Sequence, residues 1–419
     1  MIMFPVIPAL RFVGSTCLLS LLALPGELKL KESDHKALSK LVGAYFSALN
    51  DEKGIFESLQ KLLEQIAATD KRLKGAKLLA SVGDWEQVFR ITTEDHLEET
   101  LKKKGEVTST KLKSDSLELN IAYCTPKKAA KGALPLVLSV CDVGQSPSDN
   151  LNTNWNDPVV REGAILVALD LGKDTQSFGL FGSPTAPGGT YLIMTALRLV
   201  QREFPIDCNR RYLAGAGKGF AAVEATATSY PHVFAGVIGI GDVALADPGN
   251  LENFRSLPSL FLKGGDGVKA IEAKLGEFGF SNCRLEAAGG VTEAWDWIGK
   301  NPRSAYPDHV TFAPKIDQAS SVYWVSLSGF QSSEKPHVDA KADRASNTIT
   351  IDAQKVANVL VYLNDELVDL DKPVRFVING TIHEQTVERN APEMIKNQYH
   401  GGDWGRVFMA SVSQNVPEK

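Results

Sequence analysis

The stretch Arg211-Tyr212-Leu213-Ala214-Gly215-Ala216-Gly217-Lys218-Gly219 decides the fold, because apolar residues pass directly into glycines at every second position. Glycine adopts positive φ without a Cβ clash and lets two backbone segments approach closely. The stretch therefore predicts a buried strand that turns sharply into a helix, and residues 220–229 have the composition of that helix.

The middle glycine of this turn carries the main functional prediction. In a G-x-S-x-G turn, the middle residue presents a nucleophilic side chain above the sheet from a strained backbone. Gly217 occupies that position here, so the strain is relaxed and the nucleophile is missing. A phosphate-binding loop is the alternative for Gly217-Lys218, but it would need glycine in place of Tyr212 and serine or threonine in place of Gly219.

The composition is that of a globular protein with a substantial core. The chain has 419 residues, of which 43% are hydrophobic and 23% charged, with a formal net charge of −5. Its basic clusters are short and are not interleaved with aromatic residues. We therefore expect no nucleic-acid binding.

The N-terminus predicts export to the periplasm or the exterior of the cell. Arg11 is followed by an apolar run over residues 12–24 and then by Pro25-Gly26. The run is short for a membrane span and is placed like the core of a signal peptide, so residues 1–26 are expected to be removed. An uncleaved membrane anchor and a merely buried segment remain as alternatives.

The cysteines and histidines do not predict a metal site or a cofactor. The sequence contains no C-x-x-C and no H-E-x-x-H pattern. One of the five cysteines lies in the N-terminal segment, and the spacing of the other four favours buried free thiols over disulfides: Cys124, Cys141, Cys208 and Cys283.

Three regions follow the N-terminal segment. Residues 27–114 have helical periodicity, with a turn at residues 51–54, and Asp84 with Gln87 resembles a capping box. Residues 115–306 alternate strands with helices, which predicts a mostly parallel sheet covered on both faces. Residues 307–419 change to a period of two, which predicts a small all-β domain.

Particular elements are predicted within these regions. Residues 117–123 alternate like a half-exposed edge strand, whereas residues 134–140 and 164–169 are continuous apolar runs typical of buried strands. Asn379-Gly380 predicts a two-residue hairpin turn in the last region. The same residues begin an N-x-T sequon, but the turn explains them without a glycan.

Two phrases around the turn resemble a known family. Residues 206–215 read I-D-C-N-R-R-Y-L-A-G and residues 229–237 read S-Y-P-H-V-F-A-G-V. They are similar to the D-x-N-R-x-Y-L-x-G-x-S-x-G-G and P-x-x-F-A-G phrases of the esterase D, feruloyl-esterase and phospholipase/carboxylesterase-like branch of the α/β-hydrolases. The resemblance spans about residues 115–310 and implies an α/β-hydrolase-like fold with serine hydrolase ancestry. Residues 297–307 also resemble the exit into a β-domain that some exported bacterial members carry.

The departures from this family fall on the catalytic positions. Acyl transfer on this fold needs a nucleophile, a histidine, an orienting carboxylate and donors for the oxyanion. The serine corresponds to Gly217, and residues 287–300, where the histidine is expected, contain none. Asp266 matches the position of the family's orienting carboxylate, and we interpret it as a vestigial acid without its catalytic partners. The family's H-G-G oxyanion loop is replaced by Cys141-Asp142-Val143-Gly144, with Lys218 following the nucleophile position.

These departures predict a degenerate hydrolase that serves as a binding or structural module, with a small ester-like ligand in the cleft or a protein partner. An active hydrolase with a relocated site is the alternative. Its nucleophile would be Ser183 or Cys141, assisted by Asp266 or Asp142 and by a histidine such as His309 or His400. In a third hypothesis, the helical and β-rich regions carry the function by binding a protein partner, and the central domain is a spacer. His232, within the second family phrase, is interpreted as structural.

Overall fold

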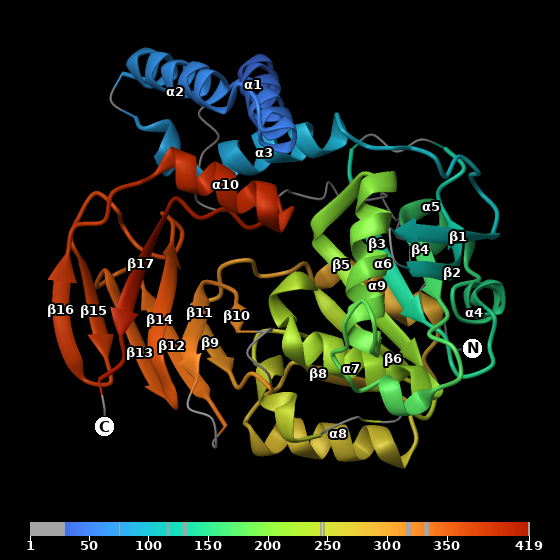
Figure 1. Cartoon of the computed structure of the whole chain (residues 1–419). Coiled ribbons are helices and arrows are strands. Elements are labelled where there is room, and N and C mark those ends of the chain that lie inside the picture. Colours follow the sequence, from blue (N-terminus) through green and yellow to red (C-terminus); the bar gives the residue numbers. More distant parts are fainter. Residues whose placement is uncertain are drawn as a thin grey trace, which may run out of the picture.

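The computed structural model describes residues 30–417, apart from residues 75, 115–116, 129–131, 244, 246–247, 316–319 and 331–334. The predicted signal peptide, residues 1–26, lies outside the described residues. Among the helices that are described, none is both long and apolar enough to cross a membrane. Figure 1 shows the central sheet on the right, two smaller sheets on the left and a layer of helices above them.

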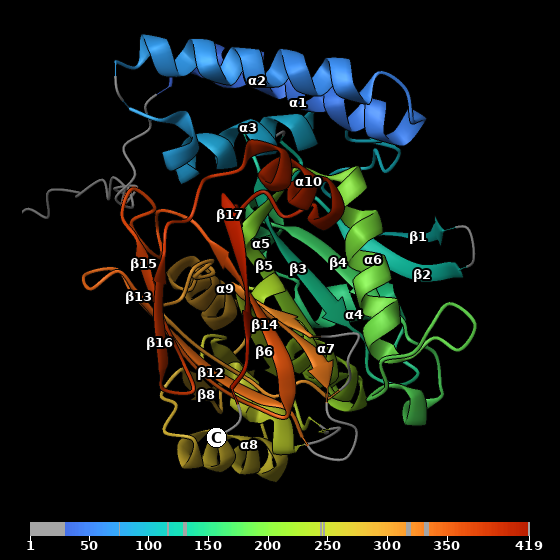
Figure 2. The same cartoon turned by 60° about the vertical axis from the view of Figure 1, so that its left-hand side comes forward.

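Three helices form the N-terminal layer: α1 (Glu32–Asp51), α2 (Ile55–Arg72) and α3 (Val82–Glu94). The predicted turn between the first two is confirmed, because Glu52 and Gly54 have φ of 55° and 66°. Figure 2 shows α1 and α2 side by side above α3. The capping box expected at Asp84 is wrong, because α3 begins at Val82 after the N-cap Ser81. The carboxylate of Asp84 instead accepts a hydrogen bond of 2.6 Å from Ser81 Oγ.

The central sheet has eight strands in the order β1-β2-β4-β3-β5-β6-β7-β8. The strands from β3 onward run parallel, while β2 is antiparallel to both β1 and β4. The mostly parallel sheet predicted from the sequence is therefore confirmed. The strand bounds are β1 (Thr108–Ser114), β2 (Leu117–Cys124), β3 (Leu134–Val140), β4 (Ile165–Leu169), β5 (Ile206–Ala216), β6 (Gly236–Ile240), β7 (Ser259–Leu262) and β8 (Cys283–Glu286).

One detail of this sheet differs from the sequence prediction. The strand at residues 117–123 was expected at the edge, but β2 pairs on both sides and β1 forms the edge. The alternation in β2 arises because one end is half covered, whereas its last four residues are buried. The sheet thus begins at Thr108, before the boundary predicted at residue 115.

Helices cover both faces of the central sheet, as predicted. The core on one face includes residues of α6, α7 and α8, and the core on the other includes residues of α4, α5 and α9. Their bounds are α4 (Pro147–Asn154), α5 (Pro158–Gly163), α6 (Gly189–Glu203), α7 (Phe220–Ser229), α8 (Asp266–Glu277) and α9 (Val291–Lys300). Short 3-10 turns lie at η1 (Leu78–Ala80), η2 (Thr175–Ser177), η3 (Gly217–Gly219), η4 (Pro231–Val233) and η5 (Pro248–Phe254).

The C-terminal region is a sandwich of two sheets, ordered β10-β11-β14-β17 and β16-β15-β13-β12-β9. The predicted Asn379-Gly380 turn is confirmed, because φ is 47° and 83° there and Ile378 pairs directly with Thr381. The region differs from an all-β domain by one helix, α10 (Ala391–Gly401). The strands are β9 (His309–Phe312), β10 (Ser321–Val322), β11 (Val325–Phe330), β12 (His337–Asp343), β13 (Thr348–Gln354), β14 (Val356–Leu363), β15 (Val374–Ile378), β16 (Thr381–Gln385) and β17 (Ala410–Asn415).

The N-terminal helices and the C-terminal sandwich share a single hydrophobic core. Trp85 of α3, Trp324 and Phe376 are all fully buried within it. Cys208 of the central strand β5 belongs to the same core. The N-terminal helices and the C-terminal region are therefore packed together, and β5 reaches into their contact.

Buried charges fasten this shared core to the central sheet. Asp403, which follows α10, accepts hydrogen bonds from Arg211 Nη2 at 2.9 Å and from Arg303 Nη1 and Nη2 at 2.5 and 2.9 Å. Although burial alone would raise it, the two guanidinium groups hold the pKa of Asp403 far below its usual range. A bulge in β5 supplies a further acceptor, Asn209 Oδ1, which lies 2.8 Å from Arg303 Nη2.

Candidate functional site

The predicted sharp turn lies at the end of β5. Gly217 has φ of +50° in the short η3 turn, and α7 begins at Phe220. Positive φ is costly for residues with a Cβ, and it is the conformation in which an elbow of this type holds its nucleophile. The turn thus has the geometry of such an elbow, with glycine at its middle position.

The flanking glycines are required by close packing. A Cβ on Gly219 would lie 2.2 Å from the carbonyl oxygen of Cys141. A Cβ on Gly215 would lie 2.7 Å from Val223 Cγ2. The elbow is therefore pressed against both the end of β3 and its own helix.

The carboxylate of Asp142 fills the space above Gly217. Its Oδ1 accepts hydrogen bonds from the backbone N–H of Val143 at 2.8 Å and of Lys218 at 2.9 Å. A Cβ built on Gly217 would lie 2.4 Å from both Cγ and Oδ2 of Asp142 and 2.6 Å from Oδ1. In hydrolases with this elbow, the oxyanion hole consists of the N–H after the nucleophile and an N–H from the loop after the equivalent of β3. Asp142 therefore places an anion of the protein itself between the two matching donors.

A hydrogen-bonded chain fixes the loop that carries Asp142. The Asp142 N–H donates to Gln145 Oε1 at 3.3 Å, and Asn150 Nδ2 donates to the same oxygen at 3.0 Å. Asn150 in turn accepts from Ser139 Oγ at 2.8 Å, which accepts from Trp155 Nε1 at 3.1 Å. Because Ser139, Asn150 and Trp155 are fully buried, the loop is tied to the core beneath it.

The predicted acid does not join this arrangement. Asp266 begins α8, with 97% of its side chain exposed, and forms an ion pair with Lys269 at 2.9 Å. The hydrogen bond from Lys269 lowers the pKa of Asp266. Its described contacts are therefore those of an exposed residue in the first turn of a helix.

The two alternative nucleophiles lie in ordinary surroundings. Cys141 is 3% exposed, and burial, reinforced by the charge of Asp170, raises the pKa of its thiol to about 12. Such a thiol is almost entirely protonated at neutral pH and is a poor nucleophile. Ser183 Oγ lies 3.2 Å from Thr185 Oγ1 and accepts the Ala186 N–H at 3.2 Å, as a turn residue does.

The candidate histidines have other partners. His309 Nε2 lies 2.7 Å from Asp339 Oδ2 in the C-terminal sandwich, and the ring of His400 packs against Tyr399 on α10. His232 is buried, and burial lowers its pKa well below the usual value. Within the described part of the chain, we find no hydrogen bond that joins a histidine to Ser183 or Cys141.

Sequence reasoning named Asp142 as part of the altered loop, or as an assisting acid, but missed its position in the anion hole. The available signal was the combination of an acidic residue directly after β3 and glycine at the nucleophile position.

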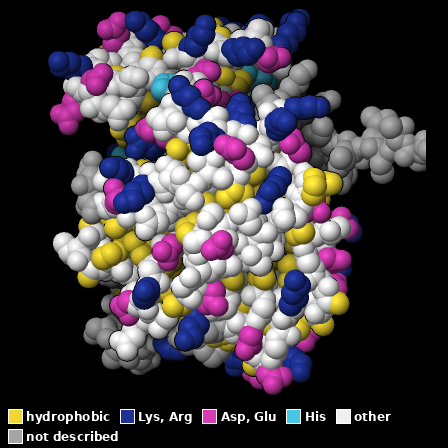
Figure 3. Space-filling view, turned by 90° about the vertical axis from the view of Figure 1, so that its right-hand side faces the viewer, with side chains coloured by type: hydrophobic (Ala, Val, Ile, Leu, Met, Phe, Trp, Pro, Cys, Tyr) yellow, Lys and Arg dark blue, Asp and Glu magenta, His cyan; other side chains and the backbone are white. Residues whose placement is uncertain are grey.

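Among the described residues, no cluster of three or more histidine, cysteine, aspartate or glutamate side chains could hold a metal ion. The face on the right of Figure 1 carries acidic and basic side chains intermixed (Figure 3).

Comparisons with known proteins find likeness in structure alone. No protein-family model matches the chain. No curated protein matches it either. A solved thermostable esterase shares 18% identity at a TM-score of 0.38, covering 47% of this chain and 63% of its own. A ferulic acid esterase shares 14% at a TM-score of 0.35, covering 46% of this chain and 93% of its own. An S-formylglutathione hydrolase from Staphylococcus aureus shares 11% at 0.36, covering 46% and 98%.

These likenesses are too slight to carry an argument about activity. The strand order, with β4 between β2 and β3, and the elbow between β5 and α7 carry the assignment of the fold. The central domain has the α/β-hydrolase fold. Fold alone does not settle function, so the chemistry has to be argued from the elbow itself.

Proposed function

We propose that this protein is a non-hydrolytic α/β-hydrolase-fold protein whose central domain serves as a binding or structural module. The observation that supports this most directly is the Asp142 carboxylate, which accepts both backbone N–H groups at the elbow. It also lies where a side chain at residue 217 would begin.

The physical argument concerns what ester hydrolysis would require at this place. A substrate carbonyl has to enter the anion hole and receive a nucleophile about 3 Å away. Here the substrate oxygen would have to displace a charged acceptor that makes two charge-assisted hydrogen bonds, which are stronger than bonds to a neutral ester oxygen. Even after such displacement, Gly217 offers no attacking atom.

Turnover and covalent labelling test this proposal. Purified protein would be assayed with p-nitrophenyl acetate and butyrate and treated with a fluorophosphonate probe that labels activated serines. We expect background turnover and no label. Stoichiometric labelling would refute the proposal, and the modified residue could be found by mass spectrometry, with Ser183→Ala as a direct check of the relocated-site alternative.

Restoring the serine sharpens the test. We expect Gly217→Ser to remain inactive, because its side chain would collide with Asp142 and residues 287–300, where the family resemblance puts the base, contain no histidine. The double variant Asp142→Gly, Gly217→Ser removes the collision but still lacks the base, so it should remain near background as well. Robust turnover by the double variant alone would mean that Asp142 is the sole block and that a base lies nearby.

We further propose that residues 1–26 direct the protein out of the cytoplasm. The apolar run after Arg11 supports this proposal. Expression of the full chain in a bacterial host, followed by fractionation and intact mass measurement, tests it. We expect a chain shortened by about the length of the leader, whereas a full-length cytoplasmic product would contradict export.

A further inference from the structure

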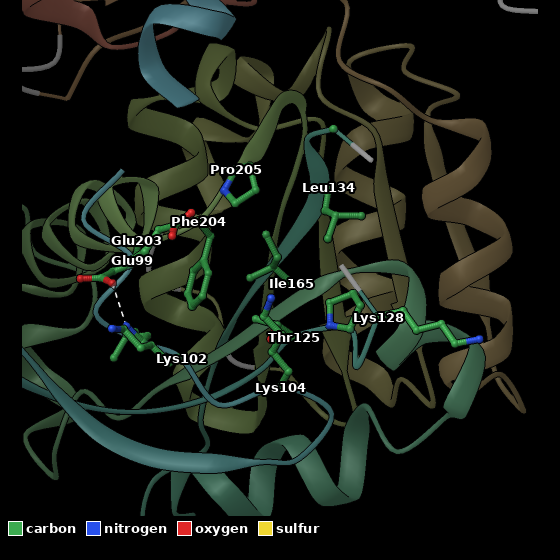
Figure 4. Close-up of a pocket in the computed structure, with 13 residues that line it drawn as sticks. Glu99, Lys102, Lys104, Thr125, Lys128, Leu134, Ile165, Glu203, Phe204 and Pro205 are labelled. Carbon is green, nitrogen blue, oxygen red and sulfur yellow. Dashed lines mark hydrogen bonds between the residues drawn. The ribbon is translucent and has the colours of Figure 1, made fainter. Parts of the chain in front are cut away.

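A cavity of about 470 Å³ lies at the end of the central sheet where the parallel strands start, whereas the elbow lies where they finish. It opens where the parallel strands begin, and its floor is formed by Leu134 of β3, Ile165 of β4 and Phe204 with Pro205 before β5. Figure 4 shows these side chains gathered around the opening. Its volume is within the range of roughly 300–1,000 Å³ found for small-molecule sites.

The wall of this cavity is an irregular segment with built-in anchors. The buried carboxylate of Glu203 accepts the N–H groups of Thr100 at 2.7 Å and Leu101 at 3.0 Å. Two residues further along, the Lys103 N–H donates to Tyr123 Oη at 3.3 Å. The segment is thus fixed from beneath through its backbone, and Glu203 is fully engaged in holding it.

The rim of the cavity is positively charged. Lys102 and Lys104 flank the anchored Lys103, and Lys128 lines the cavity from the segment after β2. All three cavity lysines are exposed, and none forms an ion pair with a described residue. Glu99 is the acidic lining residue that is not engaged as an anchor, so the rim carries a net positive charge.

We propose that this cavity binds a small amphiphilic carboxylate, with its anionic head among the three lysines and its hydrocarbon body on the apolar floor. The apolar floor disfavours a wholly polar anion, because such a ligand would make no apolar contact with Leu134, Ile165 and Phe204. Lysine binds an anion as a point charge, so a monoanionic carboxylate on a hydrocarbon chain suits both the rim and the floor. The inference goes beyond the proposed loss of hydrolysis and does not rest on it.

Calorimetric titration of the full-length protein with octanoate tests the proposal. Acetate carries the head without the body, and 1-octanol carries the body without the charge. We expect octanoate to bind more tightly than either, with an affinity that falls as salt is added because the lysines are exposed. No binding of octanoate, or equal binding of octanoate and 1-octanol, would overturn the proposal.

Variants place the binding at this cavity. Because both side chains are exposed, the double variant Lys102→Ala, Lys104→Ala should fold normally, and it should bind octanoate about fivefold or more weakly than the wild type. The matched control, Lys40→Ala with Lys300→Ala, removes two exposed lysines elsewhere and should bind as the wild type does. Unchanged octanoate binding by the cavity variant would overturn the assignment, even if octanoate bound the protein at another place such as the elbow.

Discussion

Two aspartates hold separate segments together in this molecule, and they do so in opposite surroundings. Asp142 is partly exposed and accepts two backbone N–H groups at the elbow. Asp403 is 7% exposed and is held by the guanidinium groups of Arg211 and Arg303. The first carboxylate joins the elbow to the loop after β3 within a single domain, whereas the second fastens the C-terminal region to the central sheet.

The difference between them is one of solvation. Water can reach the backbone groups at the elbow and replace part of what Asp142 provides. The guanidinium groups at the junction are cut off from water, with Arg211 only 3% exposed, so removing their counter-charge leaves cations buried without compensation. The junction should therefore be the more sensitive of the two regions, although it contains no feature of the predicted site.

Asp403→Ala should have the largest effect on stability. We expect it to lower the free energy of unfolding by about 3–5 kcal/mol, because breaking a buried ion pair strands the remaining charge. Urea or thermal unfolding measures this loss. The matched control is Asp371→Ala, whose side chain is 56% exposed and pairs with Lys77 and Arg389. The control should cost about 1 kcal/mol or less, and equal losses for both variants would contradict the comparison.

Gly217→Ala should have the next largest effect, and its origin lies at the elbow. A Cβ there meets the Asp142 carboxylate at 2.4 Å and also has to adopt positive φ. We expect a loss of about 2–4 kcal/mol from the backbone strain and the displaced hydrogen bonds together.

A double-mutant cycle separates these two causes. In the background Asp142→Gly, the collision is absent, so Gly217→Ala should cost about 1–2 kcal/mol from positive φ alone. The resulting coupling energy between the two positions should be about 1–3 kcal/mol, measured by urea unfolding of all four proteins. Additive effects would show that the carboxylate does not occupy the elbow in solution.

Glu86 of α3 should make the stability of the junction depend on pH. Burial raises the pKa of Glu86 to about 8, although the hydroxyl of Tyr306 donates to it at 3.2 Å and Arg303 opposes the shift. Glu366 and Asp403 also face it and add to the rise. An acid with a raised pKa keeps its proton in the folded state but loses it on unfolding. Stability should therefore fall from about pH 4.5 to about pH 8 and level off above that.

Glu86→Gln removes this titration while keeping a hydrogen-bond acceptor for Tyr306. The variant should match the wild type near pH 4.5 and exceed it by on the order of 2 kcal/mol at pH 8.5, because each unit of pKa shift is worth at most about 1.4 kcal/mol. Unfolding at several pH values measures the difference. Glu64→Gln on exposed α2 is the control, and a pH dependence shared by both variants would count against Glu86 as its source.

The fold could be predicted further than the site because its signals are local. The apolar runs at residues 134–140 and 164–169 were sufficient to locate two buried strands, β3 and β4. Asn379-Gly380 was sufficient for its turn, since positive φ is a property of those residues themselves. The position of β2 was missed because its alternation looked like an edge, and the pairing with β1 depends on contacts that a single segment does not show.

The filled elbow and the junction depend on residues that are distant in sequence. The glycine at the middle of the turn was visible as Gly217, but the bond from Lys218 to Asp142 spans 76 positions. The bond between Arg211 and Asp403 spans 192 positions and left no pattern that periodicity could detect. Charged residues ordinarily indicate a solvated surface, so burial of Asp403 ran against the prior expectation for its type.

Asp266→Ala should have the smallest effect on stability, and it extends the comparison of the two aspartates to one that is almost fully exposed. Asp266 follows β7 where the hydrolase resemblance puts the acid, yet its side chain is 97% exposed and pairs with Lys269 alone among its described ion pairs. We expect a change in melting temperature within about 1 °C and no change in octanoate binding or residual ester turnover. A clear loss of turnover in this variant would instead connect Asp266 to chemistry at the elbow. The position of Asp142 argues against that outcome, because its carboxylate lies where a nucleophilic side chain at residue 217 would begin.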